Sequence, residues 1–188
     1  RNRKYGWVRR LVAENNLTVD DLILPIFIRE GKNRVEKIKS MPGSNRYTID
    51  KLNNIINTAS KLKIPMVAIF PNTPGVKKNS FGSEALNEDN LVCRAIRKIK
   101  QINPNIGVMA DVALDPYTDH GHDGILKNKE ILNDETINIL SKQALLQSQM
   151  GCDVIAPSDM MDGRVGVIRK TLDKNNFKNV QILSYAVK

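Results

Sequence analysis

Gly107-Val-Met-Ala-Asp-Val112 is a short, nearly continuous apolar run, and a polar stretch with both histidines of the chain follows it. Runs of this kind, without regular polar alternation, are typical of strands that are buried on both faces of a parallel sheet. Four more runs of the same character lie at residues 22–28, 65–70, 153–157 and 181–187. The sequence therefore predicts five parallel strands.

The segments between these runs carry apolar residues at helical spacing. The third of these segments can be capped at its N-terminus by Asn133 or Asp134. Helices that alternate with strands imply right-handed crossovers and a parallel sheet. We expect helices at about residues 52–62, 91–102, 137–145 and, more weakly, 165–172.

Five such strands form either an open flavodoxin-like sheet or the first part of a (β/α)8 barrel. No G-x-G-x-x-G motif follows the first run, so a dinucleotide-binding fold lacks its main signal. The long loops after the second, third and fourth runs favour the barrel. Residues 124–133 predict a small hairpin above the sheet, and the chain shows no linker or repeat, so we expect one domain over residues 1–188.

The composition is that of a soluble globular domain, with 188 residues, 41% hydrophobic and 26% charged. The net charge of +9 raises the possibility of nucleic-acid binding, but the basic residues are dispersed and aromatics make up only 5%, which favours a solvated basic surface. No apolar run approaches the roughly 18 residues of a membrane helix, and no secretory signal follows Arg1. Cys93 and Cys152 form no C-x-x-C motif and are expected to be reduced, buried thiols rather than a disulfide.

The polar stretch after residue 112 is the first candidate site. It contains Asp111, Asp115, Asp119 and Asp123 together with His120 and His122. Oxygen and imidazole groups on one loop suit a metal site or acid–base chemistry. The alternative is a hydrogen-bonded turn in which Asp side chains satisfy loop amides. The spacing matches no defined metal motif, so a metal held within this loop alone is disfavoured.

The second candidate is Ala156-Pro-Ser-Asp-Met-Met-Asp-Gly-Arg164, which follows the fourth run. Ser158, Asp159 and Arg164 would suit the binding of a polar substrate. The alternative is a cap for the next helix, with Ser158 or Asp162 as the N-cap residue and Asp162 paired with Arg164.

The third candidate is Ser184-Tyr-Ala-Val-Lys188, at the end of the fifth run. A lysine at the inner end of a barrel strand is desolvated, which disfavours the ammonium form and frees the amine to attack a carbonyl group. A single lysine at a strand end is more often a surface residue. Because the other two loops lie at the same end of the predicted sheet, we interpret Lys188 as a covalent nucleophile.

Together these segments resemble the porphobilinogen synthase (δ-aminolevulinic acid dehydratase) family. The resemblance covers nearly the whole chain, and its matching segments occur in the family's order. They are Asp21-Leu-Ile-Leu-Pro-Ile-Phe27, Ser40-Met-Pro-Gly43, Ala68-Ile-Phe-Pro71, Gly82-Ser-Glu-Ala85, Asp111-Val-Ala-Leu-Asp-Pro-Tyr117, Leu132-Asn-Asp-Glu-Thr136, Ala156 to Arg164 and Ser184-Tyr-Ala-Val-Lys188.

The resemblance implies a TIM barrel, of which about the first five strands are present, with its site on the C-terminal face. It implies a hydro-lyase of tetrapyrrole (heme) biosynthesis that condenses two 5-aminolevulinate molecules to porphobilinogen through lysine Schiff bases. Lys188 matches the first of these lysines. Asp111 and Ser158 match residues near a substrate amine, and Asp159 and Arg164 match the rest of the second loop.

Two departures from the family pattern concern the metal cofactor and the part of the domain that this chain contains. Zinc-dependent members carry three cysteines where this sequence has Ala113, Asp115 and Asp123, so the resemblance implies the aspartate-type branch without a zinc–cysteine site. In that branch magnesium often acts at a remote site, whose residues lie outside this chain segment. The second lysine of the family, the arginine-bearing lid and the last three strands would follow Lys188, and most of the N-terminal arm would precede Arg1. We therefore expect a domain that is incomplete at both ends and comes from a longer polypeptide.

The resemblance also implies a cytoplasmic enzyme that forms a homo-octamer or a smaller ring, with no nucleic-acid or membrane partner. Two other functional classes remain as alternatives: a different Schiff-base aldolase, and a non-catalytic truncated barrel retained for assembly. The two polar loops argue against the aldolase because they match this family in detail. A basic nucleic-acid binder is the least favoured alternative.

Overall fold

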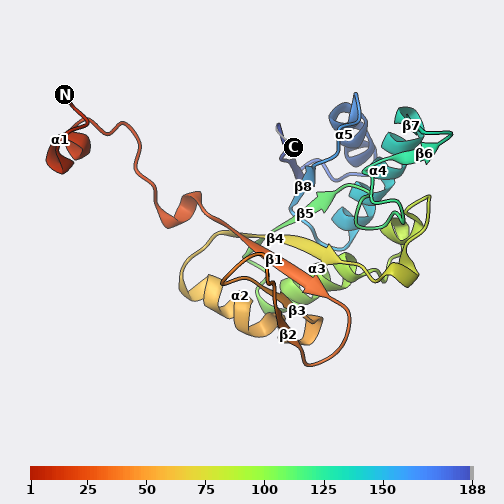
Figure 1. Cartoon of the computed structure of the whole chain (residues 1–188), viewed down its shortest axis with the longest axis horizontal. Helices are drawn as coiled ribbons and strands as arrows, with labels where there is room; N and C mark the ends of the chain where they lie inside the picture. The colour runs from red at the N-terminus through yellow and green to blue at the C-terminus, as the bar shows by residue number, and fades with distance from the viewer. Residues whose placement is uncertain (187–188) are drawn as a thin grey trace.

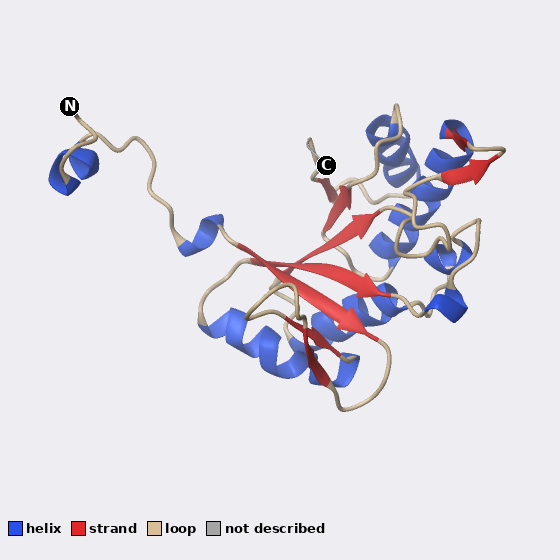
Figure 2. Cartoon of the chain, in the orientation of Figure 1, coloured by secondary structure: helices blue, strands red, loops and turns tan. Residues whose placement is uncertain are grey.

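The computed structural model describes residues 1–186, and residues 187–188 lie outside it (Figure 1). Within the described chain, seven strands form one sheet in the order β2-β3-β1-β4-β5-β8-β9, and two more form a hairpin (Figure 2). The strands of the large sheet are β1 (Ile23–Arg29), β2 (Val35–Lys37), β3 (Asn45–Tyr47), β4 (Met66–Asn72), β5 (Gly107–Val112), β8 (Val154–Pro157) and β9 (Gln181–Ile182).

The order of the strands distinguishes a barrel from an open doubly wound sheet. β1, β4, β5, β8 and β9 are parallel and lie side by side in the order in which they occur along the chain. Because each parallel crossover is right-handed, a sheet that never reverses its strand order receives every helix on the same face. A flavodoxin-like sheet reverses its order and carries helices on both faces. The predicted first part of a (β/α)8 barrel is confirmed.

The two faces of the sheet differ as this topology requires. One face carries Ile26, Val67, Val108 and Ile155, which belong to a large buried core shared with the helices. The other carries a small cluster that consists of strand residues and Tyr185. Since strand side chains alternate between faces, unbroken apolar runs were needed to supply both. The members of the small cluster are Ala68, Met109, Val154 and Ala156, with Met66, Phe70 and Tyr185 packed against them.

The helices on the outer face follow the predicted stripes. Asn90 caps the second of them by accepting a hydrogen bond from the Cys93 N–H at 2.8 Å. A further short helix, α1 (Gly6–Leu11), lies apart from the sheet in the N-terminal segment (Figure 1). The outer helices are α2 (Leu52–Lys61), α3 (Leu91–Ile102), α4 (Asn133–Gln149) and α5 (Arg164–Lys174). Single 3-10 turns lie at Val19–Asp21, Ile49–Lys51, Gly75–Lys77 and Ser83–Leu86.

The expected cap of the third outer helix was wrong. Helix α4 begins at Asn133 itself, and its N-cap residue Leu132 makes no side-chain cap hydrogen bond. The Asn133 amide is used elsewhere: it accepts from the Asp162 N–H at 2.8 Å and donates to the Asp162 carbonyl at 3.2 Å. Asn133 therefore joins α4 to the loop after β8.

The hairpin predicted over residues 124–133 is confirmed as β6 (Ile125–Lys127) and β7 (Glu130–Leu132). Thr136 of α4 holds it in place, since its Oγ1 accepts from the Ile125 N–H at 2.9 Å and donates to the Leu132 carbonyl at 2.6 Å. Strands β2 and β3 were not predicted. They are three residues each, and β3 pairs parallel with the end of β1, with Phe27 beside Arg46.

The fifth strand is shorter than the predicted 181–187, since β9 covers Gln181–Ile182. Its hydrogen bonds to β8 nevertheless continue. Leu183 N–H donates to the Ile155 carbonyl at 2.9 Å, and Tyr185 N–H donates to the Pro157 carbonyl at 3.2 Å. The segment that leads to Lys188 thus remains attached to the sheet as far as Tyr185.

Two glycine substitutions test the packing around the hairpin. A Cβ on Gly124 would lie 2.8 Å from Ile131 Cγ2 and 3.1 Å from Thr136 Oγ1. We expect Gly124→Ala to destabilise the fold by about 1–2 kcal/mol through overpacking, seen as a lower midpoint of thermal unfolding. Gly166→Ala is the control, because it meets nothing within 4 Å inside α5; it should stabilise by about 0.5–1 kcal/mol. Equal midpoints for the two variants would contradict this packing.

Candidate active site

The carboxyl ends of the parallel strands meet at one edge of the sheet, and a hollow of about 250 Å³ opens there. Two of the predicted residues, Asp111 and Asp115, line it. The Phe27 and Phe70 rings, with centroids 5.7 Å apart, form its apolar side. Its other lining residues are Arg46, Pro71, Asn72 and Pro116. The hollow thus combines two carboxylates, one guanidinium group and an aromatic wall.

We call the segment between β5 and β6, residues 113–124, the aspartate-rich loop. The two histidines of the chain help to fold it. The His122 N–H donates to His120 Nδ1 at 3.1 Å, and the Gly124 N–H donates to His122 Nδ1 at 3.1 Å. Both bonds require an Nδ1 without a proton. In these two bonds imidazole nitrogens, and not the Asp side chains of the turn alternative, accept the loop amides. The role of the carboxylates in a functional site stays a prediction. Asp123, next to this turn, is buried.

The loop after β8 is organised by a buried carboxylate. The Asp159 side chain is 0% exposed, and its Oδ2 lies 3.3 Å from Arg164 Nε. Its Oδ1 accepts from the Met161 N–H at 2.7 Å. Burial raises the pKa of Asp159 above its ordinary value, against the effects of the Met161 N–H and of Arg164, and the negative charge of Asp123 raises it further.

Arg164 connects this loop to the segment that leads to Lys188. Its guanidinium donates to the Met161 carbonyl at 3.1 Å and reaches Ser184 Oγ at 3.4 Å and the Tyr185 carbonyl at 3.5 Å. Tyr185 packs against the cluster that contains Met109, and Asp111 lies two residues further along β5, on the same face. Burial, and then the negative charge of Asp111, raises the pKa of Tyr185. The end of β5, the loop after β8 and the end of β9 are therefore one connected unit.

The predicted site residues are mostly brought together, with one exception. In the pairing of β5 with β8, Asp111 lies beside Ala156, two residues before Ser158. The Ser158 N–H continues this ladder to the Val112 carbonyl at 3.3 Å. Asp111, Asp115, Asp123, Ser158, Asp159 and Arg164 all lie at this edge of the sheet. Lys188 is outside the described residues, so its role stays a prediction.

The capping alternative for the second loop was wrong in its details. The N-cap residue of α5 is Gly163, whose φ of 80° suits glycine, and it makes no side-chain cap hydrogen bond. The ion pair of Arg164 is with Asp159 instead of Asp162. The chain turns sharply here, so an acid five residues before the arginine reaches it.

Sequence reasoning missed several residues of the hollow. Phe27 and Phe70 could have been found, because they are the inward-facing residues near the ends of two predicted strands. Arg46 gave no such signal, since the three-residue strand that carries it has no apolar pattern. It is ion-paired to Glu36 at 3.1 Å, and Glu36 is also paired with Arg29.

Neither cysteine lines the hollow. Cys93 and Cys152 are both free and buried, as predicted. Burial raises the pKa of Cys93 to about 11 and that of Cys152 to about 12, so both stay protonated near neutrality. Cys152 precedes β8 and hence lies at the opposite end of the strands. Among residues 1–186, no group of three His, Cys, Asp or Glu side chains is arranged to hold a metal ion. No helix of the described chain is long and apolar enough to span a membrane.

A barrel sector with its polar loops at the carboxyl ends of the strands has the architecture of the β/α-barrel enzymes. The family model described as delta-aminolevulinic acid dehydratase matches residues 1–188, and the chain belongs to this family.

Individual relatives agree with this assignment. The chain is 54% identical over 188 residues to the delta-aminolevulinic acid dehydratase of Bradyrhizobium diazoefficiens, of which it covers 53%. It is 45% identical over 193 residues to that of Methanothermus sociabilis, of which it covers 58%. The crystal structure of the Toxoplasma gondii ME49 enzyme in complex with the reaction product porphobilinogen superposes with a TM-score of 0.93 at 39% identity, over 100% of this chain and 53% of that one. The chain thus spans about half the length of these relatives.

The buried ion pair yields a test of the second loop. Arg164→Met leaves the Asp159 carboxylate buried without its cation, and we expect a loss of about 3 kcal/mol in stability. Asp159→Asn leaves a partly exposed guanidinium that keeps its carbonyl partners, and should cost about 1 kcal/mol. Thermal midpoints of the two variants check this order. A larger loss in Asp159→Asn would contradict the account of the pair.

Proposed function

We propose that the complete protein is a porphobilinogen synthase, a hydro-lyase that condenses two 5-aminolevulinate molecules to porphobilinogen with loss of water, in tetrapyrrole (heme) biosynthesis. The observation that carries the proposal is the joining of three loops at one edge of the sheet. Asp111, the Asp159–Arg164 pair and the segment at Tyr185 are linked by ladder and side-chain contacts. The similar Toxoplasma structure, which holds porphobilinogen, supports the choice of product.

In this proposal Lys188 is the covalent nucleophile. Its amine nitrogen forms a bond to the ketone carbon of 5-aminolevulinate, the carbonyl oxygen leaves as water, and an imine results. The Arg164 contacts to Ser184 and Tyr185 support a fixed approach to Lys188. Fixing the nucleophile before reaction lowers the entropic part of the barrel enzyme's activation free energy.

Carboxylate and hydroxyl groups would bind the substrate amine. Asp111 lines the hollow, and Ser158 lies beside the same end of β5, so we assign these two to the ammonium group. Asp115 and Asp123 belong to the loop around it. Asp159 and Arg164 remain proposed substrate-binding residues of the second loop. Their ion pair orders the loop after β8, and Arg164 also reaches the β9 segment.

We also propose that the protein belongs to the aspartate-type branch. Ala113, Asp115 and Asp123 stand where zinc-dependent members carry cysteines, and the two cysteines of the chain are buried elsewhere. From the resemblance to this branch, we assign an activating magnesium ion to a site outside this segment, and we give it no step in the reaction.

Self-association as a homo-octamer or a smaller ring, and a cytoplasmic location, complete the proposal. Exposed apolar side chains in the N-terminal segment support self-association: Trp7 is 61% exposed and Leu11 is 77% exposed. Exposed apolar groups of this size commonly mark contact surfaces.

Reductive trapping tests the covalent step. Borohydride added with 5-aminolevulinate to the complete protein should leave a stable adduct on the peptide that contains Lys188, detected by mass spectrometry. Lys188→Met should abolish turnover, whereas Lys142→Met, on an exposed turn of α4, should retain it. An active wild-type protein without an adduct at Lys188 would overturn the assignment.

Metal removal tests the branch. After treatment with EDTA, activity should return on addition of Mg²⁺ and not on addition of Zn²⁺ alone, because the active-site loop offers no thiolate. Recovery with stoichiometric Zn²⁺ in the absence of Mg²⁺ would contradict the assignment.

A further inference from the structure

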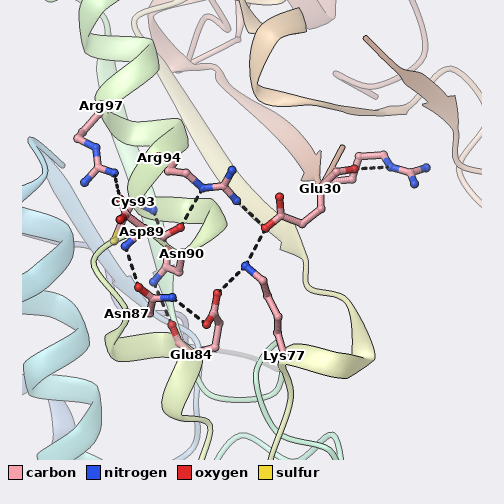
Figure 3. A network of polar contacts seen from close by, with 10 residues as sticks. Glu30, Lys77, Glu84, Asn87, Asp89, Asn90, Cys93, Arg94 and Arg97 are labelled. Carbon is pink, nitrogen blue, oxygen red and sulfur yellow. Dashed lines mark hydrogen bonds and ion pairs between the residues drawn. The ribbon is translucent and has the colours of Figure 1, made fainter. Parts of the chain in front are cut away.

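The loop between β4 and α3, residues 73–90, lies beside the aspartate-rich loop and contains no element longer than a 3-10 turn. A segment of this length needs outside contacts to hold one conformation. An alternating row of charges supplies them (Figure 3). We call this row the Lys77 clasp; it consists of Arg94, Glu30, Lys77 and Glu84.

Lys77 is the centre of the clasp. Its Nζ lies 3.0 Å from Glu30 Oε1 and 3.1 Å from Glu84 Oε1, and Arg94 reaches Glu30 at 2.5 Å. Glu30 directly follows β1 and Arg94 belongs to α3, so the loop is fixed to two rigid elements (Figure 3). The four side chains are between 13% and 35% exposed, which makes these pairs less screened than fully exposed ones.

The charges of the clasp reinforce one another over a wide pH range. Burial raises the pKa of Glu30, but hydrogen bonds from Arg94 and Lys77 outweigh it and hold this pKa below its ordinary value. The hydrogen bonds to Glu30 and Glu84 raise the pKa of Lys77. The stabilisation from Glu30 is thus lost only as the pH falls through its lowered pKa, and that from Lys77 only as the pH rises through its raised pKa.

The same loop supports the aspartate-rich loop directly. Lys78 Nζ donates to the Asp115 carbonyl at 3.4 Å. The Asn79 N–H donates to the Tyr117 carbonyl at 3.2 Å, and the Asp119 N–H donates to the Asn79 carbonyl at 3.3 Å. Asp115 therefore lines the hollow from a loop whose backbone is held by the neighbours of Lys77.

We propose that Lys77 is a positioning residue for the reaction: the clasp holds residues 73–90 against the aspartate-rich loop and so sets the place of Asp115 in the hollow. Lys77 touches neither the hollow nor a substrate in this account, and it acts through Asp115. The expected effect of Lys77 on catalysis rests on the proposed function. The expected effect of Lys77 on the conformation of the loop rests on the contacts alone.

A double-mutant cycle on the complete protein tests the catalytic consequence. Lys77→Met removes the charge and keeps most of the stem, and should lower kcat/KM for 5-aminolevulinate roughly 10-fold to 100-fold at a temperature where the protein stays folded. Lys77→Arg should restore most of this loss, and Lys142→Met is the control for loss of a lysine charge. In an Asp115→Asn background, Lys77→Met should have little further effect. A purely structural role would lower the thermal midpoint and leave kcat/KM unchanged, and that result would overturn the proposal. An equal fold-loss of kcat/KM on Lys77→Met in the wild-type and in the Asp115→Asn background would overturn it as well.

Hydrogen exchange separates this inference from the proposed reaction. In Lys77→Met, the amides of Asn79 and Asp119 should exchange faster than in the wild type, while Lys142→Met leaves them unchanged. This readout needs no turnover, so a protein that forms no porphobilinogen would refute the proposed function and leave the clasp testable. Unchanged exchange at both amides would refute the clasp.

Discussion

Parallel pairing of β5 with β8, from Met109 beside Val154 to Val112 beside Pro157, brings together the polar groups that follow these two strands. Because neighbouring parallel strands end at the same edge, the loops that follow them must meet there, however far apart they lie in the sequence. Asp111 faces the site from inside a strand, and the ladder continues through Ser158 and Tyr185. Backbone hydrogen bonds thus hold these segments side by side at one edge of the sheet.

Side chains then fix the loops. The free-energy cost of burying their charged groups is offset by specific hydrogen-bond and ion-pair partners. Asp159 would be unfavourable as an isolated buried carboxylate, and it is tolerated because Arg164 and the Met161 N–H face it. Arg164 in turn reaches the β9 segment. On the outer side, the Lys77 clasp plays the corresponding part for the loop after β4. Two sets of charged contacts thus hold the backbone segments from which the site is built.

Much of this arrangement could be predicted from the sequence. The apolar runs predicted β1, β4, β5 and β8 because strands buried on both faces have a strong composition signal, and the helical stripes predicted α2 to α5. Three features could not be found in this way. Strands β2 and β3 are too short for any periodicity, so Arg46 was missed. The partner of Arg164 depends on the turn at Gly163, which places Asp159 closer than Asp162. Asn133 looked like a cap but bonds across to Asp162, since tertiary contacts compete with local ones for the same amide.

The central claim is that the three joined loops form one site around a substrate imine on Lys188. The most direct measurement is a crystal structure of the complete protein reduced with borohydride in the presence of 5-aminolevulinate. Our account predicts continuous density from Lys188 Nζ to the substrate, with the Asp111 carboxylate within hydrogen-bond distance of the substrate amine. Substrate density that is absent from Lys188, or a Lys188 that points away from the hollow lined by Asp111 and Asp115, would contradict it.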